Sequence, residues 1–274
     1  MDAQTELLGV VGHPVGHSLS PAFWDAALRH AQRNAAFLAF DVRPEDLGVF
    51  VRGMRVAGVR GFNVTLPHKI AAFEMCDRRS DVAEATCAVN VLVLGEEIVG
   101  DNTDVHGVTH AVRDLDVDLA GRRALVLGAG GAGRAAVYAL QREGAEVSVA
   151  NRTSERAAAL GVPVVEWSLV ADVLSGFDIL VHTTSVGIDG RASVVEEATL
   201  RAAAAGRLVA VLDVVYAPNE TPLVHAARAA GLNASDGLRM LVHQAGEAWR
   251  LFFGDGAPLD VMHVAAARAA GRPG

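Results

Sequence analysis

Lysine is almost absent from this chain of 274 residues. Of its 24 basic residues only Lys69 is a lysine, and the other basic positions are arginine. Arginine stays protonated near neutral pH, whereas the protonation of a lysine can be tuned by its surroundings. A position that must exchange a proton could not drift to arginine. Lys69 is therefore a candidate proton donor or base.

Other scarcities limit the class of protein. Only two cysteines occur, and neither lies in a metal-binding or redox spacing, which favours reduced thiols and predicts no metal site. No apolar run is long enough to span a bilayer, and the N-terminus lacks the basic start and apolar core of a signal peptide. The net charge of −8 disfavours nucleic acids and anionic membranes as partners. We expect a cytoplasmic monomer or homodimer that acts on a small molecule.

The length and the alternation of apolar segments predict two α/β domains. In the first domain, the predicted strands are 7–12, 36–41, 61–65, 88–94 and 97–100, and the predicted helices are 20–32, 44–57 and 70–75. A second unit starts near Val105, with strands at 124–127, 146–150, 179–183 and 208–214. Its predicted helices are 108–115, 131–142, 155–160, 199–205, 223–230 and 238–253, and a last helix begins near Val264.

A glycine-rich turn opens the helix of the second unit. Gly128-Ala129-Gly130-Gly131-Ala132-Gly133 fits the pattern G-x-G-x-x-G, follows an apolar strand and precedes an apolar helix. In that setting the first glycine permits the tight turn, the second lets a pyrophosphate approach the backbone, and the third allows close helix packing. The alternative is a strand-to-helix turn with no ligand. The pattern predicts a dinucleotide site.

The next strand indicates which dinucleotide binds. NAD-binding proteins usually have Asp or Glu at its end, whereas this chain has Asn151-Arg152-Thr153 with Arg156 one turn on. Guanidinium groups form paired, charge-assisted hydrogen bonds to phosphate. The residues therefore favour NADP over NAD, the alternative being two ordinary solvated arginines at a helix start.

Short polar side chains follow several predicted strands of the first domain. Ser18 and Ser20 lie in a strand-to-helix loop, where Ser20 could be only the helix N-cap. Asn63 and Thr65 point the same way in an extended chain. Asn90 and the segment 100–104 add further polar groups at strand ends. Ligands of open α/β sheets bind beyond the carboxyl ends of the strands, so we expect a substrate site there.

Together these segments resemble the shikimate dehydrogenase family, including its quinate and aminoshikimate relatives. The matching pieces cover nearly the whole chain in the family's order: GHPVGHSLSP, GFNVTLPHK, AVNVL, GDNTDVHG, LVLGAGGAGRAA, NRTSERA, TTSVGI, DVVYAPNETPL and GLRMLVHQA. The resemblance implies an α/β fold of two domains. A substrate domain with a mixed, mostly parallel sheet (1–105 and 237–274) would be joined to a doubly wound, Rossmann-type NADP-binding domain (106–236).

The resemblance also implies roles for particular residues. Lys69 and Asp104 would form the catalytic pair, although an ordinary salt bridge is the alternative. The substrate carboxylate would bind to Ser18 and Ser20, and the ring hydroxyls to Asn63, Thr65, Asn90 and Gln244, with Tyr216 nearby. The cofactor would contact the turn 128–132 and Asn151, Arg152, Thr153, Arg156, Thr184, Val214 and Gly237, with Asp81 as a lesser contact. The expected reaction is the reversible reduction of 3-dehydroshikimate with NADPH.

This sequence departs from the family pattern at three places. Trp24-Asp25 replaces a usual His-Asn, Val91 replaces a frequent threonine, and His182-Thr183 replaces a usual Asn-Ala. Neutral drift is one interpretation, and a paralogue that acts on quinate or aminoshikimate is another. A non-catalytic NADP-binding regulator is a further alternative, disfavoured because Lys69 and the serines remain.

Overall fold

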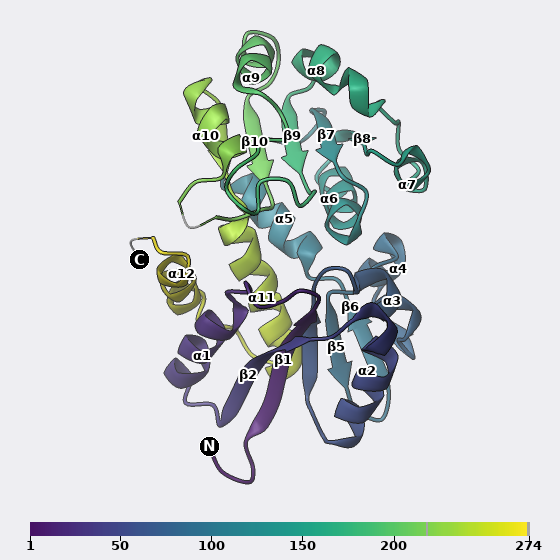
Figure 1. Ribbon diagram of the computed structural model, residues 1–274, viewed down its shortest axis with the longest axis vertical. Helices are drawn as coiled ribbons and strands as arrows, with labels where there is room; N and C mark the ends of the chain where they lie inside the picture. Colours follow the sequence, from purple (N-terminus) through teal and green to yellow (C-terminus); the bar gives the residue numbers. More distant parts are fainter. Residues whose placement is uncertain (218, 273–274) are drawn as a thin grey trace. The chain divides into compact units, whose positions relative to one another are not determined.

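The computed structural model describes residues 1–217 and 219–272 and divides into two compact units (Figure 1). The first unit comprises Met1–Thr103 and Val242–Gly274, and the second comprises Asp104–Leu241. The boundaries between the units thus fall after Thr103 and Leu241, whereas we expected domain boundaries after residues 105 and 236 from the sequence.

A six-stranded mixed sheet, in the order β2-β1-β3-β5-β6-β4, forms the centre of the first unit. Its strands are β1 (Glu6–Gly12), β2 (Ala35–Asp41), β3 (Gly61–Val64), β4 (Arg78–Arg79), β5 (Val91–Leu94) and β6 (Ile98–Asp101). β1 pairs in parallel with β2 and β3, whereas β5 runs antiparallel to β3 and β6. The carboxyl ends of β1, β3 and β6 and the amino end of β5 therefore lie at one edge of the sheet.

Helices cover both faces of this sheet. They are α1 (Ser20–His30), α2 (Leu47–Val56), α3 (Lys69–Glu74), α4 (Asp81–Thr86), the later part of α11 (Gly237–Phe253) and α12 (Leu259–Ala269). On one face, Phe62 and Val64 pack against buried side chains of α2, α3 and α4. α1 and α12 lie side by side (Figure 1), and Trp24 of α1 stacks on Phe37 of β2 with ring centroids 4.6 Å apart.

The second unit contains a five-stranded parallel sheet in the order β11-β10-β9-β7-β8. Its strands are β7 (Arg123–Leu127), β8 (Glu146–Ala150), β9 (Ile179–His182), β10 (Ala210–Asp213) and β11 (Asn233–Ser235). The chain passes from β7 to β8 at one edge and then returns to β9 on the other side of β7. The strand order therefore reverses between β7 and β9, and ligands of doubly wound sheets bind at such a reversal.

Helices also cover the two faces of the second sheet. They are α5 (Asp104–Arg113), α6 (Gly131–Arg142), α7 (Ser154–Ala158), α8 (Val170–Val173), α9 (Glu197–Ala204), α10 (Pro222–Ala229) and the start of α11. α5 packs against α6, which contacts β7 and β8. Leu125, Leu180 and Val211 belong instead to the core shared with α8, α9 and α10. The two domains and the α/β class expected from the sequence are confirmed.

The structure differs from the predicted elements where segments are short or capped unexpectedly. β4, α8 and β11 were missed because each spans four residues or fewer, and α4 was missed although it is as long as the predicted α3. The helix predicted over 44–57 is a 3₁₀ turn, Pro44–Asp46, followed by α2. The last helix begins at Leu259, directly after Pro258, rather than near Val264. In residues 1–217 and 219–272, no helix combines the length and apolar character needed to cross a membrane.

Candidate substrate and dinucleotide sites

Four buried polar side chains meet in the first unit, and we name them the amide cluster: Asn63, Asn90, Thr103 and Gln244. Asn90 Nδ2 donates hydrogen bonds to Gln244 Oε1 at 3.1 Å and to Thr103 Oγ1 at 3.0 Å. The Thr103 backbone N–H donates to Asn90 Oδ1 at 2.7 Å. Asn63 Nδ2 lies 3.5 Å from the same Gln244 oxygen. The structure therefore brings together three of the predicted substrate residues.

One acceptor of the amide cluster receives no hydrogen bond from the residues that the structure describes. Asn63 is 6% exposed, and in the part of the chain that the structure describes, no donor reaches its Oδ1. A buried polar atom without a partner costs about 1–3 kcal/mol. A ligand hydroxyl donating to this oxygen would remove that cost. The cluster is thus suited to a molecule that carries hydroxyl groups.

The way Asn90 reaches this cluster corrects one prediction. We expected Asn90 at the carboxyl end of a strand, but it directly precedes β5 at the amino end. Because β5 is antiparallel to β3 and β6, its amino end lies at the same edge as their carboxyl ends. Thr103, which follows β6, was not among the predicted site residues although it lies in the polar segment 100–104.

The two predicted carboxylate-binding serines lie after β1, at the start of α1. The N-cap of α1 is Leu19, whose side chain makes no capping hydrogen bond, so the alternative role of Ser20 as N-cap is wrong. Instead Ser20 is the first helical residue, and its backbone N–H donates to Ser18 Oγ at 3.3 Å. Thr65 follows β3, and Gly12 is the last residue of β1. A Cβ at Gly12 would lie 2.4 Å from Thr65 Cγ2. Gly12 therefore allows these two strand ends to approach.

Lys69 is the first residue of α3 and is half-buried. Its backbone carbonyl accepts a hydrogen bond from the Val89 N–H at 2.9 Å. The preceding His68 is 1% exposed, and its Nε2 lies 2.7 Å from the Val42 carbonyl oxygen, to which it donates. Burial lowers the pKa of His68 below 6.5. The buried imidazole thus fixes the start of the helix that carries Lys69, a role that no sequence motif indicated.

Asp104 belongs to the second unit, whereas Lys69 belongs to the first. Asp104 is 4% exposed and is the first residue of α5, four positions before the helix start that we predicted. Asp81 lies exposed at the start of α4 in the first unit. The roles expected for Asp104 and Asp81 stay predictions.

The glycine turn connects β7 to α6 and has the backbone that the pattern requires. Gly128 has a φ of +113°, and a Cβ there would lie 2.5 Å from Thr183 Oγ1. A Cβ at Gly133 would lie 2.2 Å from the Gly128 carbonyl oxygen. At Gly130, by contrast, no heavy atom of the described residues lies within 4 Å of such a Cβ. Packing explains two of the glycines, and Gly130 leaves room for a ligand to approach the start of α6.

Two arginines lie beyond β8, the neighbour of β7. Arg152 and Arg156 are exposed, and neither forms an ion pair within residues 1–217 and 219–272. Asn151 Nδ2 donates to the Thr153 carbonyl at 2.9 Å and so closes the turn that presents Arg152. The two guanidinium groups are available for a phosphate.

Close backbone approach also brings together Val214 and Gly237. A Cβ at Gly237 would lie 2.0 Å from the Val214 carbonyl oxygen, and the Gly237 N–H donates to the Val215 carbonyl at 3.0 Å. Tyr216 lies half-buried in the same segment. Only glycine fits at position 237, directly at the start of α11.

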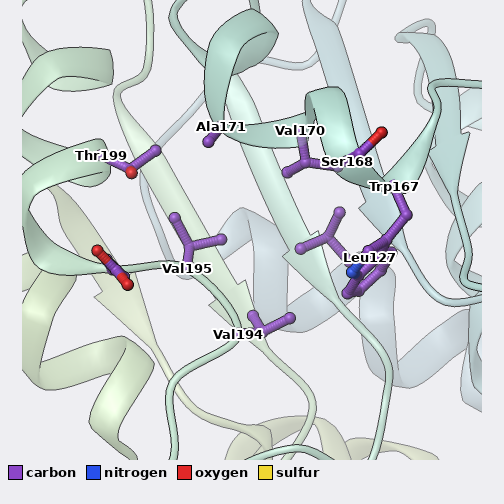
Figure 2. A pocket seen from close by; sticks show the side chains of 9 residues that line it. Leu127, Trp167, Ser168, Val170, Ala171, Val194, Val195 and Thr199 are labelled. Atoms are coloured by element: carbon purple, nitrogen blue, oxygen red, sulfur yellow. The ribbon is translucent and has the colours of Figure 1, made fainter.

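The second unit also contains a cavity of about 330 Å³ (Figure 2). Side chains from β7, α8 and the segment before α9 line it, among them Leu127, Val170 and Val195. None of the predicted site residues lines this cavity, and its walls include polar as well as apolar side chains. In the described residues, no group of three or more His, Cys, Asp or Glu side chains could hold a metal ion.

The departures from the family pattern have different structural settings. Trp24 is fully buried between Phe37 and Trp249 in the core. Val91 is the direct cross-strand partner of Asn63, so the two side chains lie on the same face of the sheet. His182 is buried at the end of β9. Val91 is therefore the departure that bears most directly on the amide cluster.

A glycine turn at the reversal of a parallel sheet, with two arginines beyond the next strand that form no ion pair among the described residues, is the arrangement of a dinucleotide-binding domain. Three family models match this chain: the shikimate dehydrogenase substrate binding domain over residues 10–92, shikimate / quinate 5-dehydrogenase over 109–226, and the shikimate 5'-dehydrogenase C-terminal domain over 237–266. The chain belongs to the shikimate dehydrogenase family.

Curated relatives and solved structures agree with this membership. The shikimate dehydrogenase (NADP(+)) of Gluconobacter oxydans is 44% identical over 260 residues, which cover 93% of this chain and 92% of the relative. The structure of shikimate 5-dehydrogenase from Thermus thermophilus in complex with NADP(H) and shikimate is 38% identical, with a TM-score of 0.86. It covers 97% of this chain and 100% of that one. The Aquifex aeolicus shikimate dehydrogenase has a TM-score of 0.88 at 36% identity, and 98% of each chain is covered.

Proposed function

We propose that this protein is an NADP-dependent oxidoreductase that reversibly reduces 3-dehydroshikimate to shikimate, a step of chorismate and aromatic amino acid biosynthesis. The observation that carries the proposal is the match of 93% of the chain to curated NADP-dependent shikimate dehydrogenases. The amide cluster and the glycine turn support it independently, because one suits a hydroxylated ligand and the other suits a dinucleotide.

The residues of the second unit fit NADP. The backbone N–H groups at the start of α6 would hold the pyrophosphate, since Gly130 leaves open space there. Arg152 and Arg156 would bind the 2′-phosphate, with Asn151 and Thr153 shaping the turn between them. When bound, NADPH supplies the hydride. Thr184 and the close pair Val214 and Gly237 would contact the remainder of the cofactor, and Asp81 would make a lesser contact.

The residues of the first unit fit a small hydroxylated acid. Ser18 and Ser20 would bind its carboxylate, because the Ser20 hydroxyl is not used as a helix cap. Asn63 would accept a hydrogen bond from a ring hydroxyl at its Oδ1, to which none of the described residues donates. The other proposed ring contacts are Thr65, Asn90 and Gln244, with Tyr216 nearby.

Lys69 would exchange the proton. In the direction of reduction its ammonium group donates a proton to the oxygen of the ring ketone, and in the direction of oxidation its neutral amine accepts that proton. Asp104 would orient Lys69 and accept a hydrogen bond from a ring hydroxyl. His68 holds the start of α3 and so limits the positions that Lys69 can take.

The identity of the ring substrate is the finer part of the proposal. Quinate and aminoshikimate are the alternatives, because Val91, which replaces a threonine frequent in the family, lies beside Asn63 of the proposed ring site. A panel of shikimate, quinate and aminoshikimate, each with NADP and NAD, tests the proposal by absorbance at the wavelength of the reduced nicotinamide. We expect the highest kcat/KM with shikimate and NADP. A higher value with quinate or aminoshikimate would identify a paralogue, and no turnover with any of the three would favour a non-catalytic NADP-binding regulator.

We also infer a cytoplasmic location, which the acidic composition and the two free thiols support. The expected oligomeric state is a monomer or a homodimer. Sedimentation of the purified protein distinguishes the two.

A further inference from the structure

A buried chain of hydrogen bonds joins the ends of β9 and β10 in the second unit. His182 and Asp213 are each 1% exposed, and His182 Nδ1 lies 2.8 Å from Asp213 Oδ1. On its other side, His182 Nε2 lies 2.5 Å from Thr184 Oγ1. The Val215 N–H donates to Asp213 Oδ1 at 3.0 Å, and the Thr221 hydroxyl donates to Asp213 Oδ2 at 2.7 Å. Of these groups, only Thr184 belongs to the proposed dinucleotide site.

The partners determine where the protons lie. A carboxylate only accepts hydrogen bonds, so His182 Nδ1 carries the proton that points to Asp213. In a neutral imidazole the other nitrogen is then an acceptor. In this neutral form, with Nδ1–H turned to Asp213, Thr184 donates its hydroxyl proton to His182 Nε2. The carboxylate thus determines the direction in which the Thr184 hydroxyl points.

Thr184 has one acceptor position left. A threonine oxygen has one proton and two lone pairs, and the Val186 N–H donates to one of these lone pairs at 3.2 Å. No donor from the described residues reaches the other, and Thr184 is only half-buried. With its proton held by His182, the Thr184 oxygen can only accept from a ligand.

Thr184 lies beside the glycine turn. A Cβ at Gly128 would lie 3.2 Å from Thr184 Cγ2. The neighbouring Thr183 donates its hydroxyl to the carbonyl of Leu127, the last residue of β7, at 2.9 Å. The acceptor of Thr184 is therefore next to the part of the sheet where the dinucleotide is proposed to bind.

We propose that His182 and Asp213 are positioning residues that hold Thr184 Oγ as an acceptor for a hydrogen-bond donor of NADP. This inference rests on the proposed binding of NADP. Phosphate oxygens are acceptors, so the partner of Thr184 is a ribose hydroxyl, the amino group of adenine or the carboxamide N–H of the nicotinamide. Asp213 acts through His182, and His182 acts through Thr184.

Two substitutions of His182 separate the two hydrogen bonds of its ring. In His182→Asn, the amide nitrogen can replace Nδ1 and keep the bond to Asp213, but Thr184 loses its acceptor. In His182→Gln, the amide oxygen can replace Nε2 and keep the bond to Thr184, but Asp213 loses a donor. His182→Asn also introduces the residue that the family pattern led us to expect, so it tests whether the imidazole has this task in the present chain.

The measurement is the Kd of NADP by equilibrium binding, together with the unfolding temperature. We expect His182→Asn to weaken NADP binding about fivefold to tenfold, roughly the loss of one hydrogen bond. His182→Gln should bind NADP within about twofold of the wild type and unfold at a lower temperature. Equal losses of affinity in both variants, or no loss in His182→Asn, would overturn the proposal.

Thr184→Val tests the same bond without changing the buried histidine. It should weaken NADP binding as much as His182→Asn does, and the double variant should show no further loss, because both changes remove one interaction. Thr199→Val, at another half-buried threonine of the second unit, is the matched control and should not change the Kd. Additive losses in the double variant would contradict the relay.

Kinetics and a fragment complete the test. The KM of NADP should rise in His182→Asn, while kcat and the KM of shikimate stay within about twofold. Binding of 2′-phospho-ADP-ribose, which keeps both riboses and lacks only the nicotinamide, locates the donor: an equal loss in His182→Asn places it on a ribose or the adenine, and an undiminished affinity places it on the nicotinamide carboxamide. Because the Kd is measured directly, the inference can be judged even if shikimate is not the substrate.

Discussion

Gln244 Oε1 accepts a hydrogen bond from Asn90 Nδ2 at 3.1 Å, although 154 positions separate the two residues in the chain. Asn90 precedes β5, and Gln244 lies on α11 within the segment that returns to the first unit. The same oxygen also lies 3.4 Å from Thr103 Oγ1. The amide cluster is therefore completed only when the C-terminal segment has folded.

This relationship predicts the effect of Gln244→Met. The substitution keeps the length of a side chain that is 7% exposed, but it removes the acceptor of Asn90. We expect the KM of shikimate to rise at least about tenfold, and the free energy of unfolding to fall by about 1–3 kcal/mol. The KM of NADP should stay within about twofold. Steady-state kinetics and urea unfolding measure these quantities.

Gln141→Met, at an exposed position of α6, is the control for this change and should leave both KM values unaltered. If Gln244→Met raised the KM of NADP instead, Gln244 would not belong to the substrate site.

Lys69→Arg tests the proposed proton transfer. Arginine preserves the positive charge and can form the same ion pairs, but it does not release a proton near neutral pH. We expect kcat to fall at least about a hundredfold, within the range of general acid–base catalysis, while the unfolding temperature stays unchanged. The assay is shikimate oxidation with saturating NADP.

Glu74→Gln changes an exposed charge on the same helix and should retain full kcat. If Lys69→Arg kept near-normal kcat, the lysine would be a structural partner of an ion pair and not the proton carrier.

The fold could be predicted wherever long apolar segments alternate. β8 and α6 begin and end at the predicted residues, because each has a clear period and a glycine or charged boundary. The direction of β5 could not be predicted, since strand direction depends on pairing partners distant in the sequence. The short elements β4 and β11 carry no pattern of their own.

The candidate site could be predicted in part. Residues next to strand ends, such as Asn63, were found because the chain order places them at one edge of the sheet. Gln244 came only from the family resemblance, as nothing in the pattern of α11 indicates that it meets Asn90. His68 and Asp213 were missed because burial, which gives them their roles, is a property of the packed structure.

Arg152→Asp tests the choice of cofactor. Arg152 is exposed and has no ion pair within the described residues, so its replacement should not change stability. A carboxylate would repel the 2′-phosphate of NADP and could accept from the ribose hydroxyls of NAD. We expect the KM of NADP to rise about tenfold to a hundredfold, and the KM of NAD to stay equal or fall.

The control for Arg152→Asp is Arg142→Asp, at an exposed position in the last turn of α6. It changes the net charge by the same amount, so it separates a local contact from a general electrostatic effect. Equal losses with the two variants would mean that Arg152 does not contact the phosphate.

Asp178 connects the start of β9 to three arginines, and this contact predicts a dependence of stability on pH. Its carboxylate is 3% exposed and accepts hydrogen bonds from the Arg123 backbone N–H at 2.9 Å and from Arg207 and Arg122. Burial alone would raise the pKa of Asp178, but these hydrogen bonds outweigh it and lower the pKa below 3.8. The charged form is thus stabilised in the folded protein.

Asp178→Asn should lower the free energy of unfolding by about 1–3 kcal/mol near pH 7. A carboxylate whose pKa is lower in the folded state stabilises the protein above its unfolded-state pKa, and this contribution is lost as the pH falls through the folded-state value. The difference between the wild type and Asp178→Asn should therefore be constant down to about pH 5 and shrink below 3.8. Urea unfolding across this range, with the exposed Asp172→Asn as control, measures it. A difference that stays constant at acid pH would show that the loss comes from packing and not from the charge of Asp178.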